Sequence, residues 1–200
     1  MSQRTPIALT LAALLVVSAG AHAQAGSSPQ PATAAPATAA PSAAAQPAAA
    51  LDDPTIVAIF DAANTWDMDA SALASRKSRT PAVRDFAQMM VRDHKAARQL
   101  GRDLAQKLHV TPTPPGKDFA LYQDHVKAMQ TLRKTRGAAF DRAYIDHEVT
   151  YHQAVIDAVT TQLLPATQNA DLKALETKVA PNFQAHLAAA KQVQQQVEAK

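Results

Sequence analysis

Apolar residues between residues 52 and 200 recur at spacings of three, four and seven, and no stretch alternates at period two for long. This spacing places them along one side of an α-helix, whereas a half-buried strand needs period two. Ala, Leu, Gln, Lys and Arg dominate the same region, and all five are strong helix formers. The sequence therefore predicts an all-α domain built from amphipathic helices.

Helix-breaking residues divide this region into segments. Pro54 and Pro81 each follow a residue that favours the N-cap of a helix, as prolines in a first turn do. The stretch 109–116 contains three prolines and predicts a loop, while Gly137 and Pro165 mark further boundaries. We therefore expect an up-and-down four-helix bundle with one extra short helix. The predicted helices span residues 54–77, 81–108, 118–134, 138–163 and 169–198.

The N-terminal residues predict export. Arg4 precedes the apolar run 7–17, and the Ala-His-Ala tripeptide at 21–23 fits the A-x-A pattern of a cleavage site. The run is shorter than the ~20 apolar residues that a membrane-spanning helix needs. We interpret residues 1–23 as a cleaved signal peptide, which leaves no stable membrane insertion; a retained anchor is the alternative.

Residues 24–51 form a separate segment, composed almost entirely of Ala, Pro, Thr, Ser and Gln between 26 and 50. Such a segment carries no charge and cannot bury enough apolar surface to fold, so it predicts a disordered, proline-stiffened tether. The folded domain is then expected over residues 52–200. Its charges are mixed along every segment, which argues against a nucleic-acid partner.

The chain contains no cysteine. Lipid attachment at an N-terminal cysteine, disulfides, zinc–thiolate sites and cysteine nucleophiles are therefore excluded. Together with the signal peptide, this predicts a periplasmic or secreted protein that is not a lipoprotein.

Five ionisable side chains occupy positions where the helical pattern calls for an apolar residue. Burying such a group without a partner costs ~2–7 kcal/mol even when it is neutral. Because antiparallel helices rise 1.5 Å per residue, the residues on neighbouring helices differ in depth by only about 7–9 Å. We therefore expect them to meet inside the bundle as metal ligands. They are Asp67, His94, Glu148, His152 and His186.

A structural explanation of these residues stays open. Asp67 could pair with His94 and Glu148 with His152 one turn later, as contacts within the core, and His186 could lie at the edge of its stripe. Three other histidines are expected in loops or on the surface. They are His109, His125 and His147.

Imidazole and carboxylate ligands suit iron, zinc, manganese and copper(II), and the sequence does not select among these metals. The ferritin-like di-iron centre needs two Glu-x-x-His motifs, and this chain contains none. Glu148 and His152 are instead four residues apart, on one helix face. A single divalent metal ion, held by two or three histidines and one or two carboxylates, is the favoured site.

Two stretches of the sequence resemble a known family: FAQMMVRDHKAARQL at 86–100 and AAFDRAYIDHEVTYHQAV at 138–155. They resemble the exported bacterial domain of unknown function DUF 4142, whose fold is similar to the ferritin-like bundle. The resemblance spans roughly residues 54–194 and includes His186. The family usually has a glutamate where this chain has Asp67. The resemblance implies a ferritin-like fold and no particular reaction.

Two functions follow from these observations. The first is an exported ferritin-like bundle with a metal site among its helices, serving storage, buffering or oxidation. The second is a non-enzymatic cell-envelope or stress-related interaction protein, with a purely structural polar core and an envelope protein as partner. The sequence contains neither a G-x-S-x-G motif nor a glycine-rich phosphate loop, which argues against a hydrolase. Whether the protein is an enzyme, and its oligomeric state, stay open.

Overall fold

The computed structural model describes residues 51–113, 116–117 and 119–199, so the predicted signal peptide and nearly all of the predicted tether lie outside the described residues. Within them every regular element is helical and no strand occurs, which confirms the predicted all-α fold. None of the helices in this part combines the length and the apolar character needed to cross a membrane.

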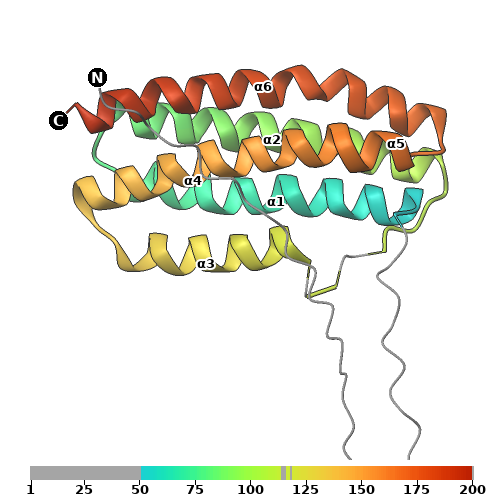
Figure 1. The fold of residues 1–200 in the computed structure, drawn as a ribbon, viewed down its shortest axis with the longest axis horizontal. Coiled ribbons are helices and arrows are strands. Elements are labelled where there is room, and N and C mark those ends of the chain that lie inside the picture. Colours follow the sequence, from blue (N-terminus) through green and yellow to red (C-terminus); the bar gives the residue numbers. More distant parts are fainter. Residues whose placement is uncertain (1–50, 114–115, 118, 200) are drawn as a thin grey trace, which may run out of the picture. The chain divides into compact units, whose positions relative to one another are not determined.

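The elements are α1 (Asp53–Lys77), α2 (Pro81–Lys107), α3 (Ala120–Lys134), α4 (Gly137–Ala158), the π-helical turn η1 (Val159–Leu163), α5 (Leu164–Ala166) and α6 (Ala170–Glu198). Four long helices, α1, α2, α4 and α6, form the core of the bundle. α1 packs against α2, α2 against α6, α6 against α4 and α4 against α1. When α3 is counted with them, consecutive helices alternate in direction, as the colours in Figure 1 show.

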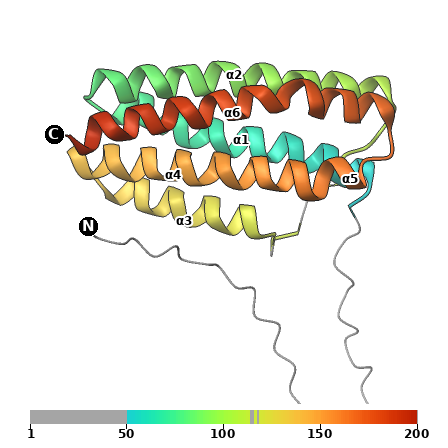
Figure 2. The same ribbon diagram turned by 45° about the horizontal axis from the view of Figure 1, so that its top comes forward.

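The extra helix α3 lies outside the four-helix core, along α1 and α4 (Figures 1 and 2). It crosses the length of the bundle between α2 and α4, so these two core helices point in the same direction. The core helices therefore run up, down, down and up in chain order. One long crossover of this kind is typical of ferritin-like bundles.

Side-chain hydrogen bonds define where the helices begin. The carboxylate of Asp52 accepts from the amide of Thr55 at 2.9 Å and caps α1. The carboxylate of Asp53 accepts from the amides of Gln168 and Asn169, both at 2.9 Å. Because this second contact joins the start of α1 to the segment before α6, it fixes the two helices in register at one end of the bundle.

The predicted apolar stripes form the core, in two parts. Toward one end, Met90, Phe140 and Tyr144 pack among residues of α1, α2, α4 and α6. Toward the other end, residues near Ile56 and Leu172 form a second cluster, and the ring of Phe60 packs with further α6 residues. The polar residues predicted on the stripes lie between these apolar layers in the sequence of each long helix.

Pro165 does not end the fourth predicted helix at residue 163, as the sequence suggested. α4 passes into the π-turn η1, in which the amide of Leu164 donates to the carbonyl of Val159, five residues back. Helical structure then continues to Ala166. Proline lacks the N–H of an ordinary helical bond, and the wider π-turn accommodates that loss.

Candidate metal centre

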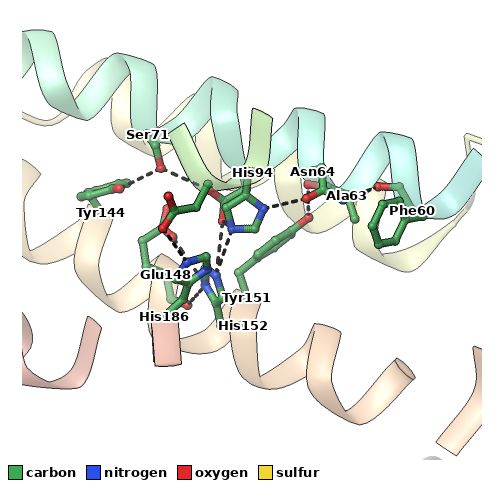
Figure 3. A network of polar contacts seen from close by, with 12 residues as sticks. Phe60, Ala63, Asn64, Ser71, His94, Tyr144, Glu148, Tyr151, His152 and His186 are labelled. Carbon is green, nitrogen blue, oxygen red and sulfur yellow. Dashed lines mark hydrogen bonds and ion pairs between the residues drawn. The ribbon is translucent and has the colours of Figure 1, made fainter. Parts of the chain in front are cut away.

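All five residues predicted as ligands lie in the interior of the bundle, each at most 5% exposed. Asp67 comes from α1, His94 from α2, Glu148 and His152 from α4, and His186 from α6. Figure 3 shows the labelled side chains of His94, Glu148, His152 and His186 directed toward one another. The structure thus brings a side chain from every core helix to one place.

Three of these side chains converge most closely. The Nε2 atoms of His94 and His152 lie 3.3 Å apart. Oδ2 of Asp67 lies 3.5 Å from Nε2 of His94 and 3.7 Å from Nε2 of His152. The three atoms therefore form a triangle with edges of nearly equal length.

Hydrogen bonds on the far side of each ring set the tautomers of the two histidines. Nδ1 of His94 lies 3.0 Å from Oδ1 of Asn64, whose Nδ2 in turn donates to the carbonyl of Phe60 at 2.7 Å. Nδ1 of His152 lies 3.0 Å from the carbonyl oxygen of Glu148. Since both partners are acceptors, both Nδ1 atoms carry the hydrogen. Each neutral ring then presents a lone pair at Nε2.

The triangle consequently consists of three acceptor atoms and no donor. Among the described residues, Oδ2 of Asp67 has no hydrogen-bond partner. Ligands at about 2.0–2.2 Å from a tetrahedral metal ion lie roughly 3.3–3.6 Å from one another. The observed edges are close to these values. The donor set and its spacing therefore fit a single metal ion.

The ring of His186 lies beside those of His94 and His152. Its Nε2 lies 3.3 Å from Oδ2 of Asp93, and its buried Nδ1 has no hydrogen-bond partner among the described residues. One ring nitrogen each of His94, His152 and His186 lie within 4.8 Å of one another. A carboxylate that binds the far nitrogen of a ligating histidine is a common device for orienting the ring.

Glu148 adds a second carboxylate next to Asp67. Oε2 of Glu148 lies 3.6 Å from Nδ1 of His152, and neither carboxylate oxygen accepts a hydrogen bond from the described residues. No Lys or Arg in the described part of the chain forms an ion pair with Asp67 or Glu148. Two buried carboxylates without a cationic partner are costly, and a divalent cation would offset that cost.

The other oxygen of Asp67 is bound by Ser71 of its own helix α1. Oγ of Ser71 donates to Oδ1 of Asp67 at 3.3 Å and lies 2.8 Å from the hydroxyl of Tyr144 on α4. Figure 3 shows this connection from Tyr144 through Ser71 toward the centre. The bonds orient the Asp67 carboxylate so that Oδ2 is left for the triangle.

Burial controls the protonation of these groups. It lowers the pKa of His94 from 6.5 to about 3, helped by the neighbouring His186. It lowers the pKa of His152 to about 4, although the charge of Asp67 opposes this shift. Burial and the charge of Asp67 raise the pKa of Glu148 well above 4.5. The imidazoles of His94 and His152 are therefore neutral at pH 7, as metal ligands must be.

One sequence prediction outside the site was wrong and another was incomplete. His125, expected in a loop or on the surface, is 9% exposed and stacks on Trp66 with ring centroids 5.7 Å apart. It belongs to a stripe of α3 with Met129 and Leu132 that packs on the bundle. His147 is half-buried rather than fully on the surface. His109 is exposed, as predicted.

The sequence analysis did not identify two residues that form hydrogen bonds with the candidate ligands, Asn64 with His94 and Asp93 with His186. Asn64 lies three residues before Asp67, on the same face of α1, so helical spacing could have found it. Asp93 is adjacent to His94 but contacts His186 on another helix. No sequence spacing connects these last two residues, and only the packing of α2 against α6 does.

Comparisons with known proteins agree with this architecture. A solved structure described as "CopM in the Cu(II)-bound form" has a similar fold, with a TM-score of 0.55 and 18% sequence identity, and the match covers 72% of this chain and 98% of that chain. No curated protein sequence matches this chain. The family model of the domain of unknown function DUF4142 matches residues 38–193. Since that match covers most of the chain, this protein belongs to the DUF4142 family.

Proposed function

We propose that this protein is an exported helical bundle that binds one divalent transition-metal ion between its four core helices. His94, His152 and Asp67 are the principal ligands, and His186 and Glu148 complete the set. The observation that carries the proposal is the triangle of three buried acceptor atoms, with edges of 3.3, 3.5 and 3.7 Å and no donor. The protein then serves metal storage or buffering in the compartment to which it is exported.

The alternative of a purely structural polar core explains the triangle less well. In such a core a histidine would donate an N–H to the carboxylate of Asp67. Both Nδ1 hydrogens are already directed to other acceptors, Asn64 Oδ1 and the Glu148 carbonyl. A second ring proton is disfavoured because burial holds the pKa values of His94 and His152 at about 3 and about 4. The lone pairs of the three acceptor atoms therefore repel one another, and a metal cation bound between them removes this repulsion.

Copper(II) and zinc are the first metals to test. Sites rich in imidazole suit both, and divalent copper binds most sites of this type more tightly than manganese, iron or zinc. The similar bundle described as CopM in the Cu(II)-bound form adds support for copper. Iron and manganese remain candidates with the same kinds of ligand.

The test is titration of the metal-free protein with Cu(II) and with Zn(II), followed by calorimetry and thermal unfolding. A metal that binds only the folded state stabilises it, by about 2.7 kcal/mol when its free concentration is 100 times Kd. We expect one ion per chain and a clear rise in Tm.

Two variants separate this site from adventitious binding. His152→Ala removes a ligand of the centre and should abolish the rise in Tm. His109→Asn removes an exposed imidazole and suits the positive φ of 53° at that position, so it should leave the rise unchanged. Equal responses of the two variants, or no response in the wild type, would favour the structural core and the interaction-protein alternative.

A further inference from the structure

A cavity of about 240 Å³ adjoins the candidate metal centre and is partly open to solvent. Its walls come from α1, α2, α4, the start of α3, the π-turn η1 and α6. They are mostly apolar and rich in aromatic rings. His94, His152 and Asn64 line it together with Phe60, Phe119 and Phe183.

The polar groups that line the interior of this cavity are already engaged. Asn64 uses Oδ1 toward His94 and Nδ2 toward the Phe60 carbonyl, and the hydroxyl of Tyr151 donates to the carbonyl of Ala63 at 2.8 Å. Two further polar liners, Asp124 and Gln162, are exposed to solvent. An occupant therefore meets apolar walls and the rings of His94 and His152, whereas Asp67, Glu148 and His186 do not line the cavity.

The volume and the walls indicate what kind of molecule fits. An apolar cavity of ~150 Å³ holds a benzene ring, so this one has room for one or two rings. Aromatic side chains favour planar aromatic ligands through stacked and edge-to-face contacts. The π-turn supplies Val159 and Leu163 to the wall, and such turns are rare and occur frequently at functional sites.

We propose that this cavity binds a small planar aromatic molecule of one or two rings, which packs beside the rings of His94 and His152. Occupation of the cavity by the rings does not rest on the proposed function, because the walls are formed by the protein alone.

The test uses three probes that differ in size. 4-Phenylimidazole and indole each carry two rings, whereas imidazole carries one small polar ring. Ala158 lines the cavity, so Ala158→Phe should fill it, and Ala154→Phe should block it from a more exposed position. The matched control is Ala96→Phe, on an exposed part of α2.

The metal-free protein tests the cavity alone. Indole and 4-phenylimidazole should raise the Tm of the wild type and of Ala96→Phe, and should have no effect on Ala158→Phe or Ala154→Phe. Absence of a shift in the wild type, or equal shifts in the filled and control variants, would overturn the proposal whether or not the protein binds metal.

Imidazole tests whether the aromatic walls select the occupant. It buries less apolar surface than the two-ring probes, so at equal concentration it should shift the Tm of the metal-free protein less. An equal shift with imidazole would contradict selection by the aromatic walls.

Discussion

His94 and His152 show how neighbours decide the chemistry of a side chain. Each ring donates through Nδ1 to an acceptor that is itself fixed by the fold, the side chain of Asn64 and the backbone of α4. The Nε2 atoms are thereby left as acceptors, only 3.3 Å apart. Such an arrangement is unfavourable without a cation and favourable with one, so the metal-free centre should carry a cost in stability.

Replacing Asp67 with asparagine should remove that loss of stability from the metal-free protein. In Asp67→Asn the side-chain oxygen can keep the hydrogen bond from Ser71, while the new amide donates to the histidine nitrogens. One buried charge disappears and a donor enters the triangle, so the metal-free protein should gain about 1–3 kcal/mol in its free energy of unfolding. Metal binding should weaken strongly in the same variant.

Urea unfolding and calorimetry measure the two effects of Asp67→Asn. A variant that loses metal affinity and gains stability supports a site built for a metal ion. A loss of stability in the metal-free variant would instead indicate that Asp67 stabilises the core as a structural partner.

At the level of the helices, much of the fold could be predicted from the sequence, because apolar spacing and prolines report directly on helical faces and ends. The stripe that carries Phe60, Asp67 and Ala74 is visible in the sequence, and so is the polar residue within it. The π-turn before Pro165 could not be predicted, because a proline in the sequence indicates a missing N–H but not the wider turn through which the helix continues.

The sequence predicted the candidate ligands of the site but not the residues that contact and orient them. Asp67, His94 and His186 interrupt apolar stripes, which is a local signal. The contact of Asp93 with His186 joins two residues that are 93 positions apart in the sequence, so no local signal predicts it. His125 differs from Asp93, because it lies four residues before Met129 and seven before Leu132 on one face of α3, and this spacing is a local signal of its burial.

Gly101 in α2 tests how closely the helices pack. A Cβ at this position would lie 2.7 Å from the ring of Phe60, which belongs to α1 and is itself buried. Alanine normally stabilises a helix relative to glycine by about 0.5–1 kcal/mol. Here Gly101→Ala should instead destabilise the protein by about 1–3 kcal/mol, because the ring must move in a packed core.

Urea unfolding of Gly101→Ala checks this prediction, and Phe60→Leu provides the control. In the double variant the clash is relieved, so the loss caused by Gly101→Ala should shrink. A stabilised single variant would show that α1 and α2 do not pack as closely as the structure indicates.

For the molecule as a whole, the bundle holds a polar layer between two apolar ones, and this should make the metal-free protein sensitive to acid. The pKa values of His94, His147 and His152 are lowered by burial from 6.5 to about 3, about 4 and about 4. Below pH 6.5 the unfolded chain therefore binds protons that the folded chain does not. Each such group removes stability at ~1.4 kcal/mol per pH unit as pH falls.

Glu148 and Glu176 act in the opposite direction, because burial raises the pKa of each above 4.5. Above pH 4.5 the folded chain keeps protons that the unfolded chain has lost. The pKa of His125 is also lowered by burial, so the histidines outnumber the two glutamates. The free energy of unfolding should therefore still fall as pH decreases from 6.5 to 4.5. Below pH 4.5 the glutamates no longer oppose the histidines, and the loss steepens.

Urea unfolding of the metal-free protein between pH 4 and pH 8 measures this dependence. We expect the free energy of unfolding to fall throughout the range below pH 6.5. A stability that is constant or rises as pH decreases would show that the histidines are protonated in the folded protein, and therefore unsuited to metal binding.

The central claim is that three imidazoles from three helices, together with Asp67, surround one metal ion. X-ray absorption spectroscopy of the protein loaded with one equivalent of Cu(II) or Zn(II) tests it most directly. The predicted spectrum has nitrogen and oxygen ligands at about 2.0–2.2 Å and the outer-shell scattering of three imidazole rings, from His94, His152 and His186. A first shell of oxygen ligands without imidazole scattering would contradict the claim.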